Sequence, residues 1–123
     1  MKEEKLFFYA VVVNKVYDGD TITDADIDLG FKVWINSSIR IDGIDCPEIR
    51  SKNQAEKELA KKAKEFTEAF CIGKHVILYS VKREKFGRVL GKIFVDDKSL
   101  GDELIKQGLA RKYDGGKRKP WKL

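Results

Sequence analysis

Hydrophobic and polar residues alternate along the first third of the chain in the manner of β-strands. A run rich in Phe, Tyr and Val occupies residues 7–17, and this composition is typical of a strand. The run ends at Asp18-Gly19, a dipeptide typical of tight hairpin turns. We therefore predict a first strand over 7–17 and a second strand that begins at Asp20.

The second and third strands are predicted from the spacing of apolar residues. Between residues 25 and 41 these residues fall mainly on odd positions, on both sides of Gly30, so two strands joined at this glycine are expected. Ile22 lies outside that phase, which predicts a β-bulge near Thr23. If the odd positions face the core, Arg40 lies on the opposite face of the third strand and points outward.

The rest of the chain mixes helical and strand patterns. It is predicted to contain, in order, a helix over 53–70, strands over 75–83 and 89–96, and a short helix over 100–107. Asn53 followed by Glu56 resembles a capping box, and Gly73 is a suitable stop for the first helix. Ser99 and Gly108 are the corresponding cap and stop of the second helix.

This order of elements predicts the fold class. Three strands, a helix, two strands and a helix is the element order of a five-stranded oligonucleotide-binding (OB) barrel, a mainly β fold with helices (α+β). A chain of 123 residues with 42% hydrophobic content has the size of one domain. We expect a single domain over residues 1–123 with a basic tail at about 111–123.

The charge distribution favours a polyanionic partner. The formal net charge is +5, and basic proteins attract nucleic acids and other polyanions. Asp114 is the only acidic residue between 105 and 123. The basic residues of the same segment are Lys106, Arg111, Lys112, Lys117, Arg118, Lys119 and Lys122. The C-terminal end is therefore the basic end.

Several kinds of catalytic site are disfavoured by what the sequence lacks. His75 is the only histidine and lies in a strand pattern, which argues against Ser-His-Asp and Cys-His nucleophiles and against histidine-based zinc sites. Cys46 and Cys71 form no CxxC motif, so two free thiols are expected. Any catalysis must therefore use carboxylates, arginines or a metal ion.

The apolar run near the N-terminus is expected to be a strand. The flank MKEEK carries no net positive charge, and no small-residue cleavage site follows the run, unlike in a signal peptide. No segment is long enough to cross a membrane. Because a leader can be removed from a precursor, we make no prediction about the cellular compartment.

The carboxylates that could take part in chemistry fall into three groups. Asp18 and Asp20 flank the first turn, and Asp42, Asp45 and Glu48 lie in RIDGIDCPE, where Asp45 and Glu48 belong to an irregular loop. The third group alternates along the second strand and comprises Asp24, Asp26 and Asp28. It does not fit an EF-hand, which would need glycine where Leu29 stands, so we expect a solvated strand face.

Hydrolysis of a phosphodiester would use such groups together. It requires a cation that polarises the phosphate, donors for the charge of the five-coordinate state, and a group that orients water. Two aspartates and a backbone carbonyl would form a hard-oxygen site that suits calcium better than zinc. Arginines would bind phosphate oxygens as planar forks. Taken singly, the stretches RIDGIDCPE and EKFGR are an ordinary loop and an ordinary hairpin.

Four motifs resemble, in order, those of the staphylococcal nuclease-like (thermonuclease) family. They are DGDT, the pattern R-x-x-x-x-D-x-P-E in RIDGIDCPE, K-x-G-R in EKFGRVLG, and LIKQGLA. The resemblance runs from about Val11 to Ala110, and the tail resembles those of short phage and bacterial members. It implies the same five-stranded barrel and calcium-dependent cleavage of DNA and RNA that leaves 3′-phosphate ends.

The resemblance also implies roles for individual residues. Asp20 and Asp45 would be calcium ligands, and Cys46 would contribute its backbone carbonyl. Glu48 would take the place of the general base or water-orienting carboxylate. The residues expected to bind the scissile phosphate and stabilise the transition state are Arg40 and Arg88.

Three positions near this set add detail to the comparison with the family. Asp18 matches the first acid of the DGDT motif, which supports the site in the family. Cys46 stands where the family usually has threonine, so a carbonyl ligand is kept and a hydroxyl is lost. Phe86 stands where the staphylococcal enzyme has tyrosine, which removes a phenol donor to a nucleotide phosphate.

The basic tail has two alternative interpretations. In the first, Tyr113 stacks on a base while cations follow the phosphates, as on single-strand binding surfaces. The residues expected to contact substrate are Lys85, Tyr113, Lys117 and Arg118. In the second, the tail is a solvated end whose Trp121 covers apolar surface.

The leading hypothesis is a monomeric, sugar-nonspecific nuclease that uses calcium and acts on DNA or RNA. Single strands are the expected preference because stacking needs unpaired bases, and no membrane partner is expected. The alternative is an OB domain that binds nucleic acid without cleaving it. The enzyme is favoured because the full set of Asp20, Arg40, Asp45, Glu48 and Arg88 is present.

Overall fold

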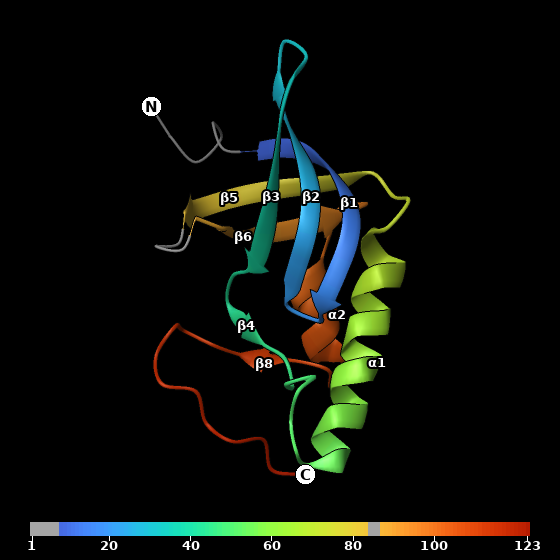
Figure 1. The fold of residues 1–123 in the computed structure, drawn as a ribbon, viewed down its shortest axis with the longest axis vertical. Coiled ribbons are helices and arrows are strands. Elements are labelled where there is room, and N and C mark those ends of the chain that lie inside the picture. Colours follow the sequence, from blue (N-terminus) through green and yellow to red (C-terminus); the bar gives the residue numbers. More distant parts are fainter. Residues whose placement is uncertain (1–7, 84–86) are drawn as a thin grey trace.

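A five-stranded barrel forms the body of the molecule. The computed structural model describes residues 8–83 and 87–123. The barrel strands are β1 (Phe8–Asp18), β2 (Thr21–Gly30), β3 (Val33–Ile41), β5 (Val76–Arg83) and β6 (Val89–Val95). They lie in the order β3-β2-β1-β5-β6, and parallel pairing of β3 with β6 closes the sheet (Figure 1). The OB-type α+β barrel predicted from the element order is therefore confirmed.

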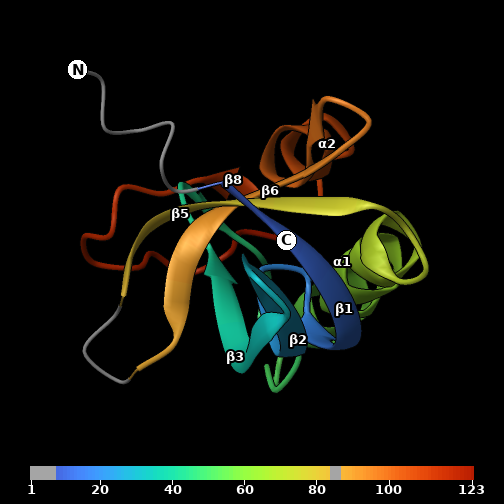
Figure 2. The same cartoon turned by 90° about the horizontal axis from the view of Figure 1, so that it is seen from above.

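Two helices pack on the barrel. α1 (Gln54–Cys71) contacts β1, and α2 (Leu100–Lys106) contacts β6 and the short strand β7 (Lys98–Ser99) (Figure 2). Both helices lie within one residue of their predicted ends. In the part of the chain that the structure describes, neither helix combines the length and the apolar character needed to span a membrane.

The predicted caps are present at both helices. Asn53 Oδ1 accepts a hydrogen bond from the Glu56 N–H at 3.1 Å, and Ser99 Oγ accepts one from the Asp102 N–H at 3.3 Å. Gly73 follows α1 with a φ of 76°, a conformation that glycine adopts without strain. Local sequence signals therefore determine where the helices begin and end.

A two-stranded ribbon that the sequence pattern does not predict lies below the barrel in the view of Figure 1. β4 (Ile44–Asp45) pairs antiparallel with β8 (Arg111–Lys112), so that Asp45 lies opposite Arg111. Each strand has only two residues, which is too short for a recognisable pattern. The ribbon brings the C-terminal tail beside the loop that follows β3.

The barrel core confirms the predicted phase only in part. Ala25, Ile27, Ile39 and Ile41 are almost completely buried. The odd positions from 29 to 35 are exposed instead, and Phe31 at the hairpin tip is 101% exposed. The reason is geometric, because the β2–β3 hairpin extends past the barrel, where none of the other elements that the structure describes covers it (Figure 1).

The predicted bulge near Thr23 is also present. The register of β2 against β3 shifts between Ile22 and Ala25. The shift allows Ile22 to enter the core, where it is completely buried, although it is out of phase with the later residues. On the other side of the bulge Thr21 pairs with Arg40, which places this arginine beside the β1–β2 turn.

α1 packs closely against the β1–β2 turn. Thr67 and Ala63 of the helix are completely buried. A Cβ atom added at Gly19 would lie 2.8 Å from Ala63 Cβ and 2.7 Å from Cys46 Sγ, and both distances are shorter than van der Waals contact. Glycine at position 19 therefore allows the helix, the turn and the loop after β4 to meet at one place.

Candidate active site

Most of the residues predicted for the site line a single pocket. The pocket has a volume of about 380 Å³ and lies where the β1–β2 turn, the loop around β4 and the C-terminal tail meet. Its lining residues are Tyr17, Asp18, Asp20, Thr21, Arg40, Asp45, Glu48, Arg88, Tyr113 and Arg118. Of the remaining predicted residues, Cys46 contacts this set through its main chain, Lys117 is exposed outside the lining, and Lys85 lies outside the described residues.

The β1–β2 turn buries two carboxylates. Asp18 and Asp20 are 7% and 6% exposed. The Asp20 N–H donates a hydrogen bond to Asp18 Oδ1 at 3.2 Å, and the Thr67 hydroxyl donates one to the Gly19 carbonyl oxygen at 2.8 Å. The turn predicted from Asp18-Gly19 is therefore held both by its own side chain and by α1.

The protonation of Asp18 depends on its neighbour. Burial, the side-chain hydrogen bond to Asp20 and the negative charge of Asp20 together raise the pKa of Asp18 to about 7, and burial contributes most. A hydrogen bond from Thr21 opposes this shift. Without a cation in the pocket, the Asp18 carboxyl therefore keeps its proton up to near-neutral pH.

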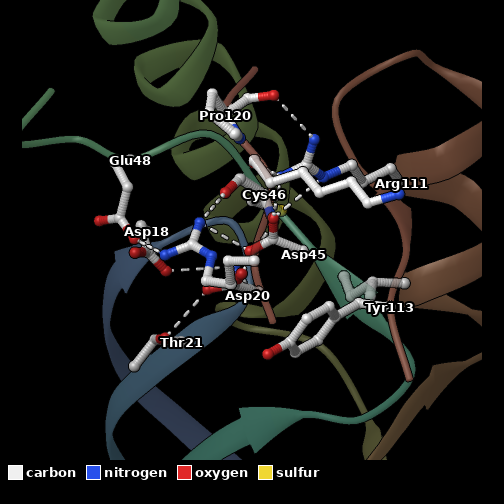
Figure 3. Close-up of polar contacts among 12 residues, drawn as sticks. Asp18, Asp20, Thr21, Asp45, Cys46, Glu48, Arg111, Tyr113 and Pro120 are labelled. Atoms are coloured by element: carbon white, nitrogen blue, oxygen red, sulfur yellow. Dashed lines mark hydrogen bonds and ion pairs between the residues drawn. The ribbon is translucent and has the colours of Figure 1, made fainter. Parts of the chain in front are cut away.

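Asp20 connects the turn to the loop after β4. The Thr21 hydroxyl donates a hydrogen bond to Asp20 Oδ1 at 3.0 Å, and the Cys46 N–H donates one to Asp20 Oδ2 at 2.8 Å. Each carboxylate oxygen has further acceptor capacity. Figure 3 shows the side chains of Asp18, Asp20 and Asp45 gathered around the same space. The sequence predicts this meeting of Asp20 and Asp45, and the structure brings the two loops together.

Arg40 does not point outward as its strand phase predicts. Its side chain is only 14% exposed, because the guanidinium turns back over the end of β3. Nη1 donates a hydrogen bond to the Ile41 carbonyl at 2.7 Å, and Nη2 donates one to the Ile44 carbonyl at 3.0 Å. Nη2 also lies 3.5 Å from Asp20 Oδ2. Arg40 therefore holds its positive charge at the pocket and fixes the β3–β4 connection around Asp20.

Asp45 is held by Arg111, which the sequence motifs do not place in the site. Asp45 is 1% exposed, and its Oδ2 accepts hydrogen bonds from Arg111 Nε at 3.1 Å and from Arg111 Nη2 at 2.9 Å. Trp121 covers the guanidinium, which lies 4.4 Å from the centre of the indole ring. The two partners are 66 residues apart in sequence, and no local pattern links them.

Arg118 of the tail also lines the pocket. Its Nη2 lies 2.7 Å from Asp45 Oδ1 and donates a hydrogen bond to the Cys46 carbonyl at 3.2 Å, while Nη1 pairs with Glu48 Oε1. Burial alone would lower the pKa of Arg118, but the hydrogen bond to Glu48 and the charge of Asp45 raise it above its ordinary value. The guanidinium is therefore a permanent positive charge among three of the predicted site residues.

Glu48 is presented to the pocket by a second glutamate. The Glu48 N–H donates a hydrogen bond to Glu56 Oε2 at 2.8 Å, and the Ser51 hydroxyl donates one to Glu56 Oε1 at 3.1 Å. Glu56 therefore does not complete the capping box predicted with Asn53, because its carboxylate binds the loop that carries Glu48. The Glu48 side chain itself is 46% exposed, so it can reach water and a ligand in the pocket.

Arg88 and Tyr113 are the remaining predicted residues that line the pocket. Arg88 lies directly before β6, and Tyr113 follows β8, where its N–H donates a hydrogen bond to the Gly43 carbonyl at 2.9 Å. The Tyr113 hydroxyl donates a hydrogen bond to the Gly116 carbonyl of the tail. Phe86, which stands where the staphylococcal enzyme has tyrosine, lies outside the described residues.

The oxygen atoms of the pocket suit a hard cation such as calcium. Asp45 Oδ1 is buried and accepts no hydrogen bond, although Arg118 lies at ion-pair distance from it. Calcium takes carboxylate and carbonyl oxygens together with water, and Asp20, Asp45 and the Cys46 carbonyl provide such atoms. Within residues 8–83 and 87–123, no group of three or more His, Cys, Asp or Glu side chains suits a metal. Main-chain oxygen and water would therefore have to complete the coordination.

The two cysteines take no direct part in this chemistry through their thiols. Both are buried and free, as predicted. Burial raises the pKa of the Cys46 thiol well above its usual range, and it raises the pKa of Cys71 to about 12. Neither thiol is therefore a thiolate nucleophile at physiological pH.

Comparison with known protein families agrees with the motifs. The family model described as "Staphylococcal nuclease homologue" matches residues 38–121. This range includes most of the pocket, from Arg40 to Arg118, but it does not include the β1–β2 turn with Asp18 and Asp20. The match covers more than half of the chain.

Several curated proteins are similar in sequence. The chain is 34% identical to "Probable endonuclease LCL3" of Pyricularia oryzae over 62% of this chain and 31% of that protein. It is 33% identical to "Thermonuclease" of Staphylococcus hyicus over 80% of this chain and 56% of that protein. It is 32% identical to "SPbeta prophage-derived endonuclease YokF" of Bacillus subtilis over 82% of this chain and 33% of that protein. The chain thus spans about a third to just over half of the length of these relatives.

Proposed function

Because the chain belongs to the family of staphylococcal nuclease homologues, we propose that it is a calcium-dependent nuclease that hydrolyses DNA and RNA to 3′-phosphate products. The names of the similar proteins, which include thermonuclease and endonuclease, support phosphodiester hydrolysis as the general reaction. The dependence on calcium, the lack of sugar specificity and the residue roles below are parts of the proposal.

One observation carries the proposal. Carboxylates and arginines from distant parts of the chain line the same small pocket, and they include Asp20, Arg40, Asp45, Glu48 and Arg88. Acidic oxygens and guanidinium groups in one pocket match the needs of phosphodiester hydrolysis, which requires a cation, donors for developing charge and an oriented water. Burial of Asp20 and Asp45 requires compensating positive charge; Arg40, Arg111 and Arg118 provide it in this structure, and a bound cation would add to it.

The residues that would hold the cation are Asp20, Asp45 and Cys46. The two carboxylates would bind through their side chains, and Cys46 would bind through its carbonyl oxygen. When bound, calcium supplies Lewis-acid polarisation of the phosphate and neutralises its charge. The hydrogen bonds from the Cys46 N–H to Asp20 and from Arg111 to Asp45 would keep both carboxylates oriented toward it.

Glu48 would orient the attacking water, and two arginines would stabilise the charge that develops on the phosphate. Glu48 is half exposed at the pocket, and the hydrogen bond from its N–H to Glu56 fixes the loop that carries it. Arg40 and Arg88 approach from β3 and from the start of β6. Their guanidinium groups would bind phosphate oxygens more strongly in the transition state than in the ground state.

The substrate would enter along the basic tail. Tyr113, Lys117 and Arg118 of this tail, together with Lys85, would contact the phosphates and bases on either side of the scissile bond. We propose that the protein acts as a monomer and prefers single strands, because unpaired bases are free to stack on Tyr113.

The test uses a single-stranded DNA with a fluorophore, incubated with calcium or with a chelator. Wild-type protein should cleave it only with calcium, and end-group analysis should show 3′-phosphates. Glu48→Gln should lower kcat by about 100-fold or more, because a water-orienting carboxylate contributes at least that much, while Kd for the DNA changes little. Glu65→Gln, the same substitution at an exposed position of α1, serves as the control with full activity.

Two outcomes would contradict the proposal in different ways. Full activity of the Glu48→Gln protein would refute the role of this residue while leaving the reaction intact. Binding of DNA without cleavage in calcium, from mildly acidic to alkaline pH, would instead identify the protein as a binding domain of the OB type.

A further inference from the structure

We infer that the C-terminal tail is a built-in competitor of the metal ion, in which the guanidinium of Arg118 occupies the oxygen atoms that the cation needs. This inference rests on the proposed calcium site and concerns its regulation. It gives Arg118 a function beyond contact with substrate.

The competition follows from the atoms that Arg118 contacts. Its Nη2 lies 2.7 Å from Asp45 Oδ1 and 3.2 Å from the Cys46 carbonyl oxygen. These are two of the oxygens that the calcium proposal assigns to the cation. A cation bound to both atoms would lie close to the guanidinium, and two positive groups repel each other strongly at such short range. Binding of the metal and docking of Arg118 therefore exclude each other.

The same guanidinium also engages Glu48 through Nη1. A carboxylate that is paired with arginine is a weaker hydrogen-bond acceptor for water than a free one. The docked tail therefore blocks both the cation position and the group that would orient the nucleophile. The docked state is inactive, and the active state requires Arg118 to leave.

The tail is anchored on both sides of Arg118. On one side the Tyr113 hydroxyl binds the Gly116 carbonyl, and on the other Arg111 Nη2 binds the Lys119 carbonyl while Trp121 stacks on Arg111. These contacts hold the arginine near the pocket and raise its effective concentration there. They also hold the segment around Arg118 in a folded arrangement on β8.

The docked arrangement is nevertheless suited to exchange. The Arg118 side chain is 39% exposed, and most residues of the tail after Tyr113 are exposed. Release of Arg118 would uncover little apolar surface. The free energy needed to release it is therefore mainly that of breaking a few charge-assisted hydrogen bonds. A phosphate chain offers a guanidinium new partners, so substrate and metal would favour the same released state.

Calcium binding to the full chain tests the inference directly. Isothermal titration calorimetry would compare wild type with Arg118→Met, which keeps an unbranched apolar stem and removes the charged guanidinium. We expect Arg118→Met to bind calcium at least about tenfold more tightly, because displacement of charge-assisted hydrogen bonds is no longer needed. Lys122→Met removes one charge from an exposed position of the same tail and should leave the affinity almost unchanged.

A second measurement follows Arg118 itself. In the ¹⁵N-labelled protein, the Nε–H resonance of Arg118 is the signal that the Arg118→Met protein lacks. Addition of calcium should move the chemical shift of this resonance toward that of a solvent-exposed arginine. Removal of calcium with a chelator should restore the original chemical shift. Circular dichroism of the variants would confirm that the barrel is intact.

The outcomes separate the two proposals. Equal calcium affinities of wild type and Arg118→Met, with an unmoved Nε–H resonance, would overturn the competition and leave the calcium site standing. Loss of calcium binding in Arg118→Met would also overturn it, because Arg118 would then support the site. If neither protein binds calcium at millimolar concentration, the proposed calcium site is wrong and the competition is wrong with it.

Discussion

The two turns of the β1–β2–β3 meander differ in a way that local sequence does not explain. The first turn, at Gly19, is polar, yet Asp18 and Asp20 beside it are buried. The second turn, at Phe31 and Lys32, belongs to an apolar segment, yet Phe31 is completely exposed. Both turns join neighbouring antiparallel strands. The difference arises from what packs against each turn, because α1 and the loop after β4 cover the first, whereas the second projects beyond the barrel.

Buried charge thus marks the end of the barrel that carries the candidate site. A buried carboxylate is costly unless hydrogen bonds or positive charges compensate it. At the first turn these partners come from Thr21, Cys46 and Arg40. The exposed apolar residues of the second turn need no such partners, since surface hydrophobic groups cost little. The first turn therefore depends on specific partners for its buried carboxylates, whereas the second turn does not.

The largest effect is expected from a substitution that disrupts the close packing around the first turn. In Gly19→Ala the new Cβ atom would lie 2.7 Å from Cys46 Sγ and 2.8 Å from Ala63 Cβ, so α1 and the β4 loop must move apart. We expect the free energy of unfolding to fall by about 1–3 kcal/mol, as for other overpacked sites. Chemical denaturation followed by circular dichroism measures it.

The matched control for this prediction lies at the second turn. Lys32→Ala changes a residue in the exposed hairpin and should alter stability by less than about 0.5 kcal/mol. Equal destabilisation by the two substitutions would show that close packing of the first turn does not distinguish it from the second.

The next effect concerns the pH dependence of the free energy of unfolding. Because the pKa of Asp18 is raised to about 7 in the folded protein and is about 4 in an unfolded chain, the folded state binds more protons between these values. The contribution of Asp18 to the free energy of unfolding therefore falls as pH rises from about 4 to 7 and is constant above that range. Denaturation of the chelator-treated protein across this range measures the slope.

Asp18→Asn removes this titration and should flatten that part of the pH profile. The substitution keeps a side-chain oxygen that can accept from the Asp20 N–H. A variant whose stability has the same pH dependence as wild type would show that groups other than Asp18 determine the slope.

The smallest effect is expected at the tip of the second turn. Phe31→Ser replaces a large apolar side chain that is 101% exposed, so no buried contact is lost. We expect the free energy of unfolding to change by less than about 0.5 kcal/mol, measured under the same denaturation conditions. A loss comparable to that of Gly19→Ala would mean that the hairpin tip is covered in solution.

Much of the fold could be predicted because it depends on short-range signals. The turn at Asp18-Gly19, the bulge near Thr23 and the cap at Asn53 each arise from residues close together in the chain. Steric preferences and hydrogen bonds within a few residues are sufficient to specify them. The motifs that resemble the thermonuclease family likewise point to the carboxylates and arginines of one site, and Asp20, Arg40, Asp45, Glu48 and Arg88 do line one pocket.

Other features became visible only when the chain folded. Arg40 bends back over the end of its strand instead of pointing outward, because backbone carbonyls there offer it better partners than water. Glu56 serves the loop of Glu48 instead of the helix cap, since the fold places that loop beside it. In each case several hydrogen-bond partners are available to the side chain, and the spacing of residues in the sequence does not show which of them it will bind.

The sequence by itself therefore determined the barrel, its helices and, through motifs that resemble the thermonuclease family, the candidate residues that line the pocket. Tertiary structure decided which carboxylates are buried, how Arg111 reaches Asp45 across 66 residues, and where Arg118 binds. The physical reason is the range of the interactions. Turns, caps and bulges are selected by the backbone preferences of neighbouring residues, whereas ion pairs between distant segments depend on closure of the barrel and docking of the tail.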